Sequence, residues 1–207
     1  MRSLLICVLF VACLCSAPAY AQQKEKKPAS PPASKPHKQP ATPQAPATPA
    51  PQPAHEIQKL AKALTGRWSI REKFEPDERM PDGGVGQGTE VWRPGPGGYT
   101  LIEEFHSQDP DREVFGLSLT WWDASTHQYK TLWCANGNPA GCDTGLALRW
   151  EDNQIVVTTD FERAGKKFSM REVLSQITPN SFTQTLDIGE SGGELKRSVT
   201  IHATKIK

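Results

Sequence analysis

The sequence GRWSIREKF, residues 66–74, shows the clearest structural pattern in this chain. Its side chains alternate between a mostly apolar set and an entirely polar set. The first set is Trp68, Ile70, Glu72 and Phe74, and the second is Arg67, Ser69, Arg71 and Lys73. Successive side chains of a β-strand point to opposite faces of the sheet, so the pattern predicts a strand with one face in a protein core.

A short helix is expected before this strand, and further strands are expected after it. Ile57, Leu60, Ala61 and Leu64 recur at helical spacing, and Thr65 and Gly66 end the pattern. Alternating segments separated by turn residues then run to the C-terminus. We count ten of them, at residues 67–75, 85–93, 99–107, 114–123, 128–135, 145–151, 154–162, 167–177, 181–188 and 194–205.

These segments predict an all-β fold, a ten-stranded antiparallel up-and-down β-barrel with a short N-terminal helix. Most connections have two to six residues, which suits hairpins between neighbouring strands. A meander of this length has exposed edges unless it closes into a barrel. We therefore assign residues 55–207 to one barrel domain.

The alternation also predicts which side chains face the barrel interior. In the fourth segment the predicted inward set is Phe115, Leu117, Leu119 and Trp121. The later inward sets are Tyr129, Thr131 and Trp133; Leu146, Leu148 and Trp150; Ile155, Val157, Thr159 and Phe161; and Leu195, Arg197, Val199, Ile201 and Ala203. Trp92 and Trp122 have outward parity, where packing under the N-terminal helix is favoured over an exposed aromatic patch. A register error of one residue would invert any of these sets.

The order of these elements resembles the calycin superfamily, which includes lipocalins, fatty-acid-binding proteins and nitrobindins. The resemblance rests on Gly66 and Trp68, a G-x-W motif that opens the first strand, and on Arg197 in the last strand. In those families the tryptophan lies at the closed end of the barrel and a late arginine packs over its ring. The resemblance therefore implies that Arg197 stacks on Trp68. The opening also resembles a bacterial secreted domain family of unknown function.

The first 54 residues have the composition of an export signal and a spacer. Residues 1–21 contain one charge, an apolar run and an Ala-Tyr-Ala site, which predicts a cleaved signal peptide and export to the periplasm or the extracellular space. The apolar run is too short to span a bilayer, and a lipoprotein anchored at Cys13 is the alternative. Residues 22–54 contain no large apolar side chain, and ten of the 18 prolines lie between residues 28 and 53. We expect a disordered Pro/Ala/Lys-rich linker.

Charge and cysteine content narrow the possible functions. Residues 55–207 carry 18 basic and 22 acidic side chains, a net charge of −4, which argues against nucleic-acid binding. After removal of the signal, Cys134 and Cys142 are the two remaining cysteines. A turn-rich segment separates them, so we predict a structural disulfide. Two cysteines without a nearby histidine supply too few ligands for zinc.

Several polar residues share the predicted inward parity. They are Glu72, Glu103, Thr131, Glu172, Gln184 and Arg197. Buried charges are costly unless they are paired or hydrated, so these residues are candidate ligand-binding groups of a cavity. Two alternatives are a register shift in those strands and structural Glu–Arg pairs. A pair of inward carboxylates could also serve acid–base catalysis.

The sequence predicts no metal site and no cofactor. The nitrobindin resemblance suggests haem on a histidine near the C-terminus, but His202 falls on the outward face, opposite Val199 and Ile201. The glycine-rich residues 83–88 lack the order of a phosphate-binding loop, so a turn is expected there.

These features favour a binding function without catalysis. The protein would bind a small apolar or amphipathic ligand inside the barrel. An envelope module that binds a protein or polysaccharide on its outer face is one alternative. A barrel enzyme that uses interior glutamates is another. A barrel filled completely by side chains would exclude both interior functions.

Overall fold

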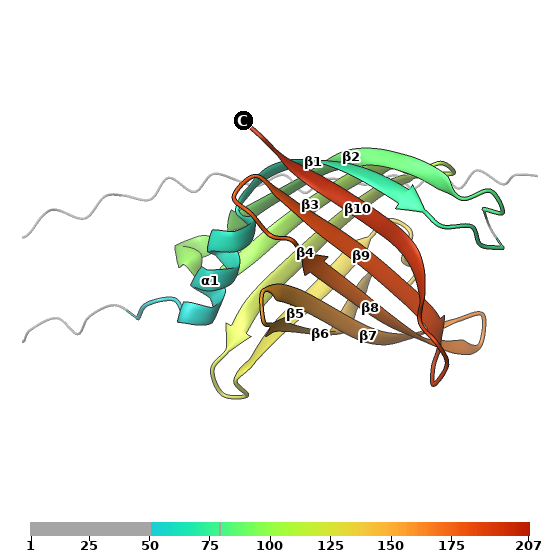
Figure 1. Cartoon of the computed structure of the whole chain (residues 1–207). Helices are drawn as coiled ribbons and strands as arrows, with labels where there is room; N and C mark the ends of the chain where they lie inside the picture. The colour runs from blue at the N-terminus through green and yellow to red at the C-terminus, as the bar shows by residue number, and fades with distance from the viewer. Residues whose placement is uncertain (1–50, 79) are drawn as a thin grey trace, which may run out of the picture. The chain divides into compact units, whose positions relative to one another are not determined.

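The computed structural model describes residues 51–78 and 80–207 (Figure 1). This part forms one α-helix, one short 3₁₀-helix and ten strands. Their bounds are α1 His55–Leu64, β1 Gly66–Phe74, β2 Gly84–Pro94, η1 Pro96–Gly98, β3 Thr100–Gln108, β4 Glu113–Asp123, β5 Gln128–Ala135, β6 Cys142–Glu151, β7 Gln154–Arg163, β8 Lys166–Ser175, β9 Ser181–Glu190 and β10 Lys196–Ile206. The predicted signal peptide and all but the last four residues of the predicted linker lie outside the described residues.

The ten strands form a closed antiparallel barrel, which confirms the predicted fold class. Each strand pairs with its neighbours in sequence, and β1 closes the barrel by pairing with β10. Closure leaves no unpaired strand edge. Local turn chemistry supports the register: Ala164 and Gly165 both have positive φ, as the two-residue turn between Arg163 and Lys166 requires. In the described part of the chain, no helix is long and apolar enough to cross a membrane.

Helix α1 covers one end of the barrel and contributes to its core (Figure 1). Ile57, Leu60 and Leu64 are buried along one face of the helix. The Tyr129 hydroxyl of β5 donates to the Glu56 carbonyl at 2.8 Å. The apolar face and this hydrogen bond hold the helix against the barrel, so this is its closed end.

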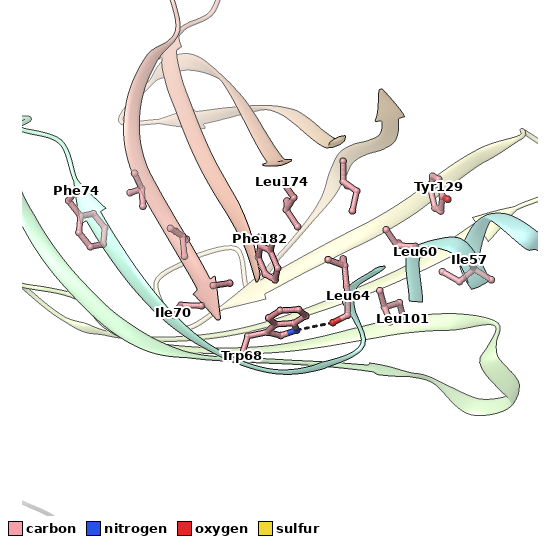
Figure 2. Close-up of a cluster of buried hydrophobic side chains, with 14 of the residues drawn as sticks. Ile57, Leu60, Leu64, Trp68, Ile70, Phe74, Leu101, Tyr129, Leu174 and Phe182 are labelled. Carbon is pink, nitrogen blue, oxygen red and sulfur yellow. Dashed lines mark hydrogen bonds between the residues drawn. The ribbon is translucent and has the colours of Figure 1, made fainter. Parts of the chain in front are cut away.

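Trp68 lies at the centre of the closed end (Figure 2). Its side chain is fully buried, and its indole Nε1 donates to the Leu64 carbonyl at 2.8 Å. Phe182 of β9 meets the indole edge-to-face, with ring centroids 4.9 Å apart. The indole therefore joins α1, β1 and β9 at one point, in the position that the G-x-W motif implies.

The predicted inward set of β4 is wrong. Leu101 of β3 is buried opposite Thr120, so Thr120 and Ser118 face the interior. Phe115 and Leu117 are 50% and 41% exposed on the outer face. Leu119 and Trp121 were also predicted to face inward, but they alternate with Ser118 and Thr120 and therefore face outward with Phe115 and Leu117.

The predicted parity of two tryptophans is corrected as well. Trp122 follows Thr120 by two residues, faces inward and packs edge-to-face on Tyr129 at 5.0 Å. Trp92 pairs across strands with the buried Glu103 and also faces inward. Both rings pack against the core cluster that contains the α1 residues, so neither contributes to an exposed aromatic patch.

Cys134 and Cys142 form a disulfide between β5 and β6, as predicted. The bridge lies near the open end of the barrel, opposite α1. Its two cysteines are eight positions apart in the sequence. In the chain-entropy model, a ring of this size restricts the unfolded chain and stabilises the fold by about 2–3 kcal/mol.

Replacing both cysteines with alanine is expected to lower the free energy of unfolding by about 2–3 kcal/mol. Urea titrations of the oxidised protein and of the Cys134→Ala/Cys142→Ala variant would measure the difference. The oxidised protein treated with a reductant serves as control and should match the variant. Equal stability of the oxidised protein and the variant would show that the bridge does not constrain the unfolded chain.

Candidate functional site

The barrel encloses a cavity of about 1150 Å³. It extends from Leu60 and Leu64 of α1 to charged side chains at the opposite, open end. Most of its wall is apolar, and residues from β6, β7, β8, β9 and β10 contribute to it. Examples are Leu146, Leu148, Val157, Leu174, Leu186 and Ile201. The volume exceeds what small organic ligands commonly occupy, so the interior is not filled by side chains.

Four glutamates point into the barrel. Glu72 of β1 is 5% exposed, Glu90 of β2 is fully buried, Glu103 of β3 is 7% exposed, and Glu172 of β8 is partly buried. Glu72, Glu103 and Glu172 line the cavity. Glu90 lies on the inner face two residues before the cavity-lining Trp92. The four strands therefore bring together acidic side chains that are far apart in sequence.

The four carboxylates are held by neutral donors. Ser118 Oγ donates to Glu103 Oε2 at 2.7 Å, and Gln184 Nε2 donates to Glu172 Oε1 at 2.6 Å. The Ser107 hydroxyl donates to Glu72. The Trp92 indole donates to Glu90 Oε2 at 3.0 Å, while Glu90 Oε1 is buried without a hydrogen-bond partner. In the part of the chain that the structure describes, none of the four forms an ion pair.

Burial without a counter-charge raises the pKa of each of these carboxyls. Burial raises the pKa of Glu90 to about 7, with a smaller contribution from the charges of Glu172 and Glu72. It raises the pKa values of Glu72 and Glu172 to about 7 as well. For Glu103, burial and then the nearby Glu90 charge raise the pKa well above its usual range. Glu72, Glu90 and Glu172 thus change charge near neutral pH.

All six candidate ligand-binding residues line the cavity: Glu72, Glu103, Thr131, Glu172 and Gln184 along its wall, and Arg197 at its open end. Gln184 bonds directly to Glu172. Thr131 lies 2.8 Å from Thr120, hydroxyl to hydroxyl. The structure therefore assembles these residues into one site, with two polar pairs along its wall.

Arg197 does not stack on Trp68, contrary to what the resemblance to the calycin superfamily implies. A β-bulge between Arg197 and Val199 shifts the register of β10, so Arg197 lies opposite Asp187 and pairs with it. The arginine lies at the open end of the cavity, far along β10 from Trp68. The cation over the indole is Lys205, whose Nζ lies 4.9 Å from the Trp68 ring centroid and donates to the Thr65 carbonyl at 2.9 Å.

Glu90 is the site residue that the sequence reasoning missed. The inner face of β2 carries Gly86 and Gly88 before Glu90, so it lacks an apolar alternation that would mark it as inward. A side chain at Gly86 would meet the Glu72 carboxylate at 2.6 Å, and one at Gly88 would meet the His106 carbonyl at 2.0 Å. Glycines that repeat every second residue were the available signal for a crowded inner face.

His202 lies on the outer face, as its parity predicts, and its Nδ1 is 3.3 Å from the Thr183 hydroxyl. Among residues 51–78 and 80–207, no group of three or more His, Cys, Asp or Glu side chains is placed to hold a metal ion. A turn was expected at residues 83–88, but Gly83, at positive φ, directly precedes β2, and residues 84–88 belong to that strand.

The open end carries charges of both signs. The basic side chains at the cavity mouth are Arg112, Arg163, Lys166, Lys196 and Arg197. Lys166 pairs with Glu190 at 2.8 Å, Arg112 lies 3.8 Å from Asp109, and Arg197 pairs with Asp187. Because these three basic side chains are paired with acidic ones, the charges at the cavity mouth are largely balanced, whereas the charged groups described in the interior are acidic.

Comparisons with known proteins identify the fold. No family model and no curated protein sequence matches the chain. The crystal structure of Rv2717c from M. tuberculosis matches with a TM-score of 0.50 at 10% identity, covering 75% of this chain and all of that one. The structure of EF1p2_mFAP2b bound to DFHBI matches with a TM-score of 0.40 at 12% identity, covering 72% of this chain and 99% of that one. The likeness to Rv2717c concerns the fold alone, which in this chain is a closed ten-stranded antiparallel barrel.

Proposed function

We propose that this barrel binds a small amphipathic ligand in its interior. The observation that supports this proposal best is the cavity of about 1150 Å³, whose wall combines apolar side chains with polar and charged ones. Binding sites for small molecules have this composition, because apolar walls supply affinity and a few polar groups fix orientation. Trp68 and α1 pack at one end of the barrel, so a ligand would enter from the opposite, open end.

A barrel enzyme is the second candidate, and one observation favours it. The pKa values of Glu72, Glu90 and Glu172 are raised to about 7, which suits general acid–base catalysis at neutral pH. Binding is the preferred function, because it requires only the cavity and its polar groups. Mass spectrometry of ligand recovered from the protein distinguishes the two: a binding protein releases its ligand chemically unchanged.

A neutral fluorescent probe, N-phenyl-1-naphthylamine, tests the proposed cavity. We expect a rise in its fluorescence with one probe per chain. Val157→Trp places an indole in the cavity wall and should weaken binding by about tenfold or more. Leu146→Trp fills the cavity from the neighbouring strand and should act in the same direction.

Thr158→Trp is the matched control, because Thr158 adjoins Val157 on the opposite face of β7. This variant should bind the probe as the unaltered protein does. Circular dichroism confirms that each variant is folded. If folded Val157→Trp and Leu146→Trp bind the probe with unaltered affinity, the ligand does not occupy the barrel.

A further inference from the structure

We propose that the ligand is an organic cation, a protonated amine carried on an apolar group, whose charge is received by the interior carboxylates Glu90, Glu103 and Glu172. This inference rests on the proposed binding function and names the chemical class of its ligand. Three independent features of the interior lead to it: the sign of its charge, an unused acceptor, and the aromatic side chains on the wall.

The interior has acidic groups without basic partners. Glu72, Glu90, Glu103 and Glu172 come from four strands, and within the described residues none is ion-paired. The basic residues of the cavity lie at its mouth, where Lys166 and Arg197 are paired with acidic neighbours. A carboxylate or phosphate ligand in the interior would meet charges of its own sign. A cation would supply the charge that the site lacks.

Glu90 Oε1 is an acceptor with no donor. The side chain is fully buried on the inner face of β2, and Oε2 is occupied by the Trp92 indole. Burying a carboxylate oxygen without a hydrogen bond is unfavourable, so the site as it stands is incomplete. Glu103 and Glu172 each receive one donor from a neutral side chain, which leaves further acceptor capacity in the same interior. An ammonium group supplies three donors together with the charge.

The wall of the cavity suits an organic cation. Trp92, Trp133 and Phe105 line it, and Phe105 packs edge-to-face on Trp133 at 5.9 Å. Aromatic faces attract ammonium groups, and the attraction is stronger where water is excluded. The aliphatic wall formed by Val157, Leu186 and its neighbours would cover the apolar part of the ligand. These features match an alkyl or aryl amine better than a hydrated metal ion.

Binding of a cation should change the protonation of the interior carboxyls. Each carboxyl has titratable or polar neighbours. Glu72 faces Asp109 and Ser107, and Glu90 faces Glu72, Glu172 and Trp92. Glu103 faces Glu90, Glu172 and Ser118, and Glu172 faces Gln184. None of these neighbours is a cation. A bound ammonium would therefore favour the ionised carboxylates, and binding would release protons near pH 7.

Three eight-carbon ligands test which ligand charge the cavity of the purified full-length protein prefers: n-octylamine, 1-octanol and octanoate. Displacement of N-phenyl-1-naphthylamine gives their affinities. We expect octylamine to bind about tenfold or more tightly than octanol, and octanoate to bind most weakly. The affinity for octylamine should increase from pH 6 to pH 8. Calorimetry in two buffers of different ionisation enthalpy should show proton release.

The variants Glu90→Gln and Glu103→Gln remove one carboxylate each. Each should reduce the preference for octylamine over octanol about tenfold, with the affinity for octanol little changed. Glu104→Gln is the matched control, because Glu104 adjoins Glu103 on the outer face and pairs with Arg93. That variant should keep the full preference.

Each outcome bears on one of the two proposals. If octanol binds as tightly as octylamine, or octanoate binds best, the cationic class is wrong while the binding function stands. If the neutral probe and all three ligands fail to bind the folded protein, the binding function itself is wrong. Binding of Mg²⁺ or Zn²⁺ that excludes octylamine from the cavity would replace the organic cation with a metal ion and overturn the inference.

Discussion

Replacing Trp68 with alanine is expected to lower the free energy of unfolding by about 3–5 kcal/mol. The indole is fully buried and packs edge-to-face on Phe182. Its Nε1 donates to the Leu64 carbonyl at 2.8 Å, so the variant also leaves a carbonyl at the end of α1 without its donor. Figure 2 shows how these contacts meet at one ring. Urea unfolding followed by circular dichroism measures the change.

Two further variants separate the contributions of Trp68. Trp121→Ala is the matched control: Trp121 lies on the outer face of β4 and is partly exposed, so we expect a loss of about 1 kcal/mol. Trp68→Phe keeps an aromatic ring but removes the indole donor, and should fall between the two. If Trp68→Ala and Trp121→Ala lose equal stability, Trp68 does not hold the closed end together.

The barrel could be predicted from the sequence because its evidence is local. Turn residues separate the strands, and the alternation within each strand is short-range. Strand β7 was expected at residues 154–162 and is observed at Gln154–Arg163, and β5 is observed where it was expected. Once ten strands with short connections are recognised, closure follows from the cost of leaving edges unpaired.

The inward faces of β2 and β4 could not be predicted by the same rule. The rule assumes that the interior is apolar, but β4 directs Ser118 and Thr120 inward and exposes Phe115 and Leu117. Small side chains are required there, because Ser118 bonds Glu103 and a side chain at Gly116 would meet the Trp133 ring at 2.1 Å. A cavity with polar groups reverses the usual pattern. The two misread strands therefore contribute polar groups to the interior, Glu90 from β2 and Ser118 and Thr120 from β4.

Arg197 illustrates a second limit. Its inward parity was counted from Val199 and Ile201, and the β-bulge between Arg197 and Val199 breaks that count. A bulge arises from the pairing of two strands, so one strand's sequence does not reveal it. The lysine that replaces the expected arginine over Trp68 is at position 205, where β10 pairs with β1.

The protein without added ligand is expected to lose stability as the pH rises from 5 to 8. A glutamate in the unfolded chain ionises near its ordinary pKa of 4.5, whereas burial raises the pKa of Glu172 to about 7. Between these values the unfolded chain has released the proton while the folded barrel still holds it. The unfolded state is therefore favoured progressively as the pH rises. For one carboxyl whose pKa changes from 4.5 to about 7, the full effect is about 3 kcal/mol.

Carboxyls with lowered pKa values do not affect the stability profile between pH 5 and pH 8. Hydrogen bonds from Ser125 and Thr126 lower the pKa of Asp123 to about 2, and the hydrogen bond and charge of Lys166 lower that of Glu190. Lowered values contribute stability that is lost as the pH falls, and this loss occurs below about pH 5. The interval from pH 5 to pH 8 thus reports the interior glutamates. Urea titrations at unit steps of pH give the profile.

Glu172→Gln should make this profile less steep, because it removes one of the interior groups that ionise near pH 7 and leaves a neutral partner for Gln184, while Glu72 and Glu90 still titrate. Glu104→Gln removes an exposed carboxylate and should leave the profile unchanged. A profile that is flat, or that rises with pH, would show that the interior carboxyls are not held protonated. The proposed cation ties this profile to function: it would bind the ionised form, so octylamine should stabilise the barrel more at pH 8 than at pH 5.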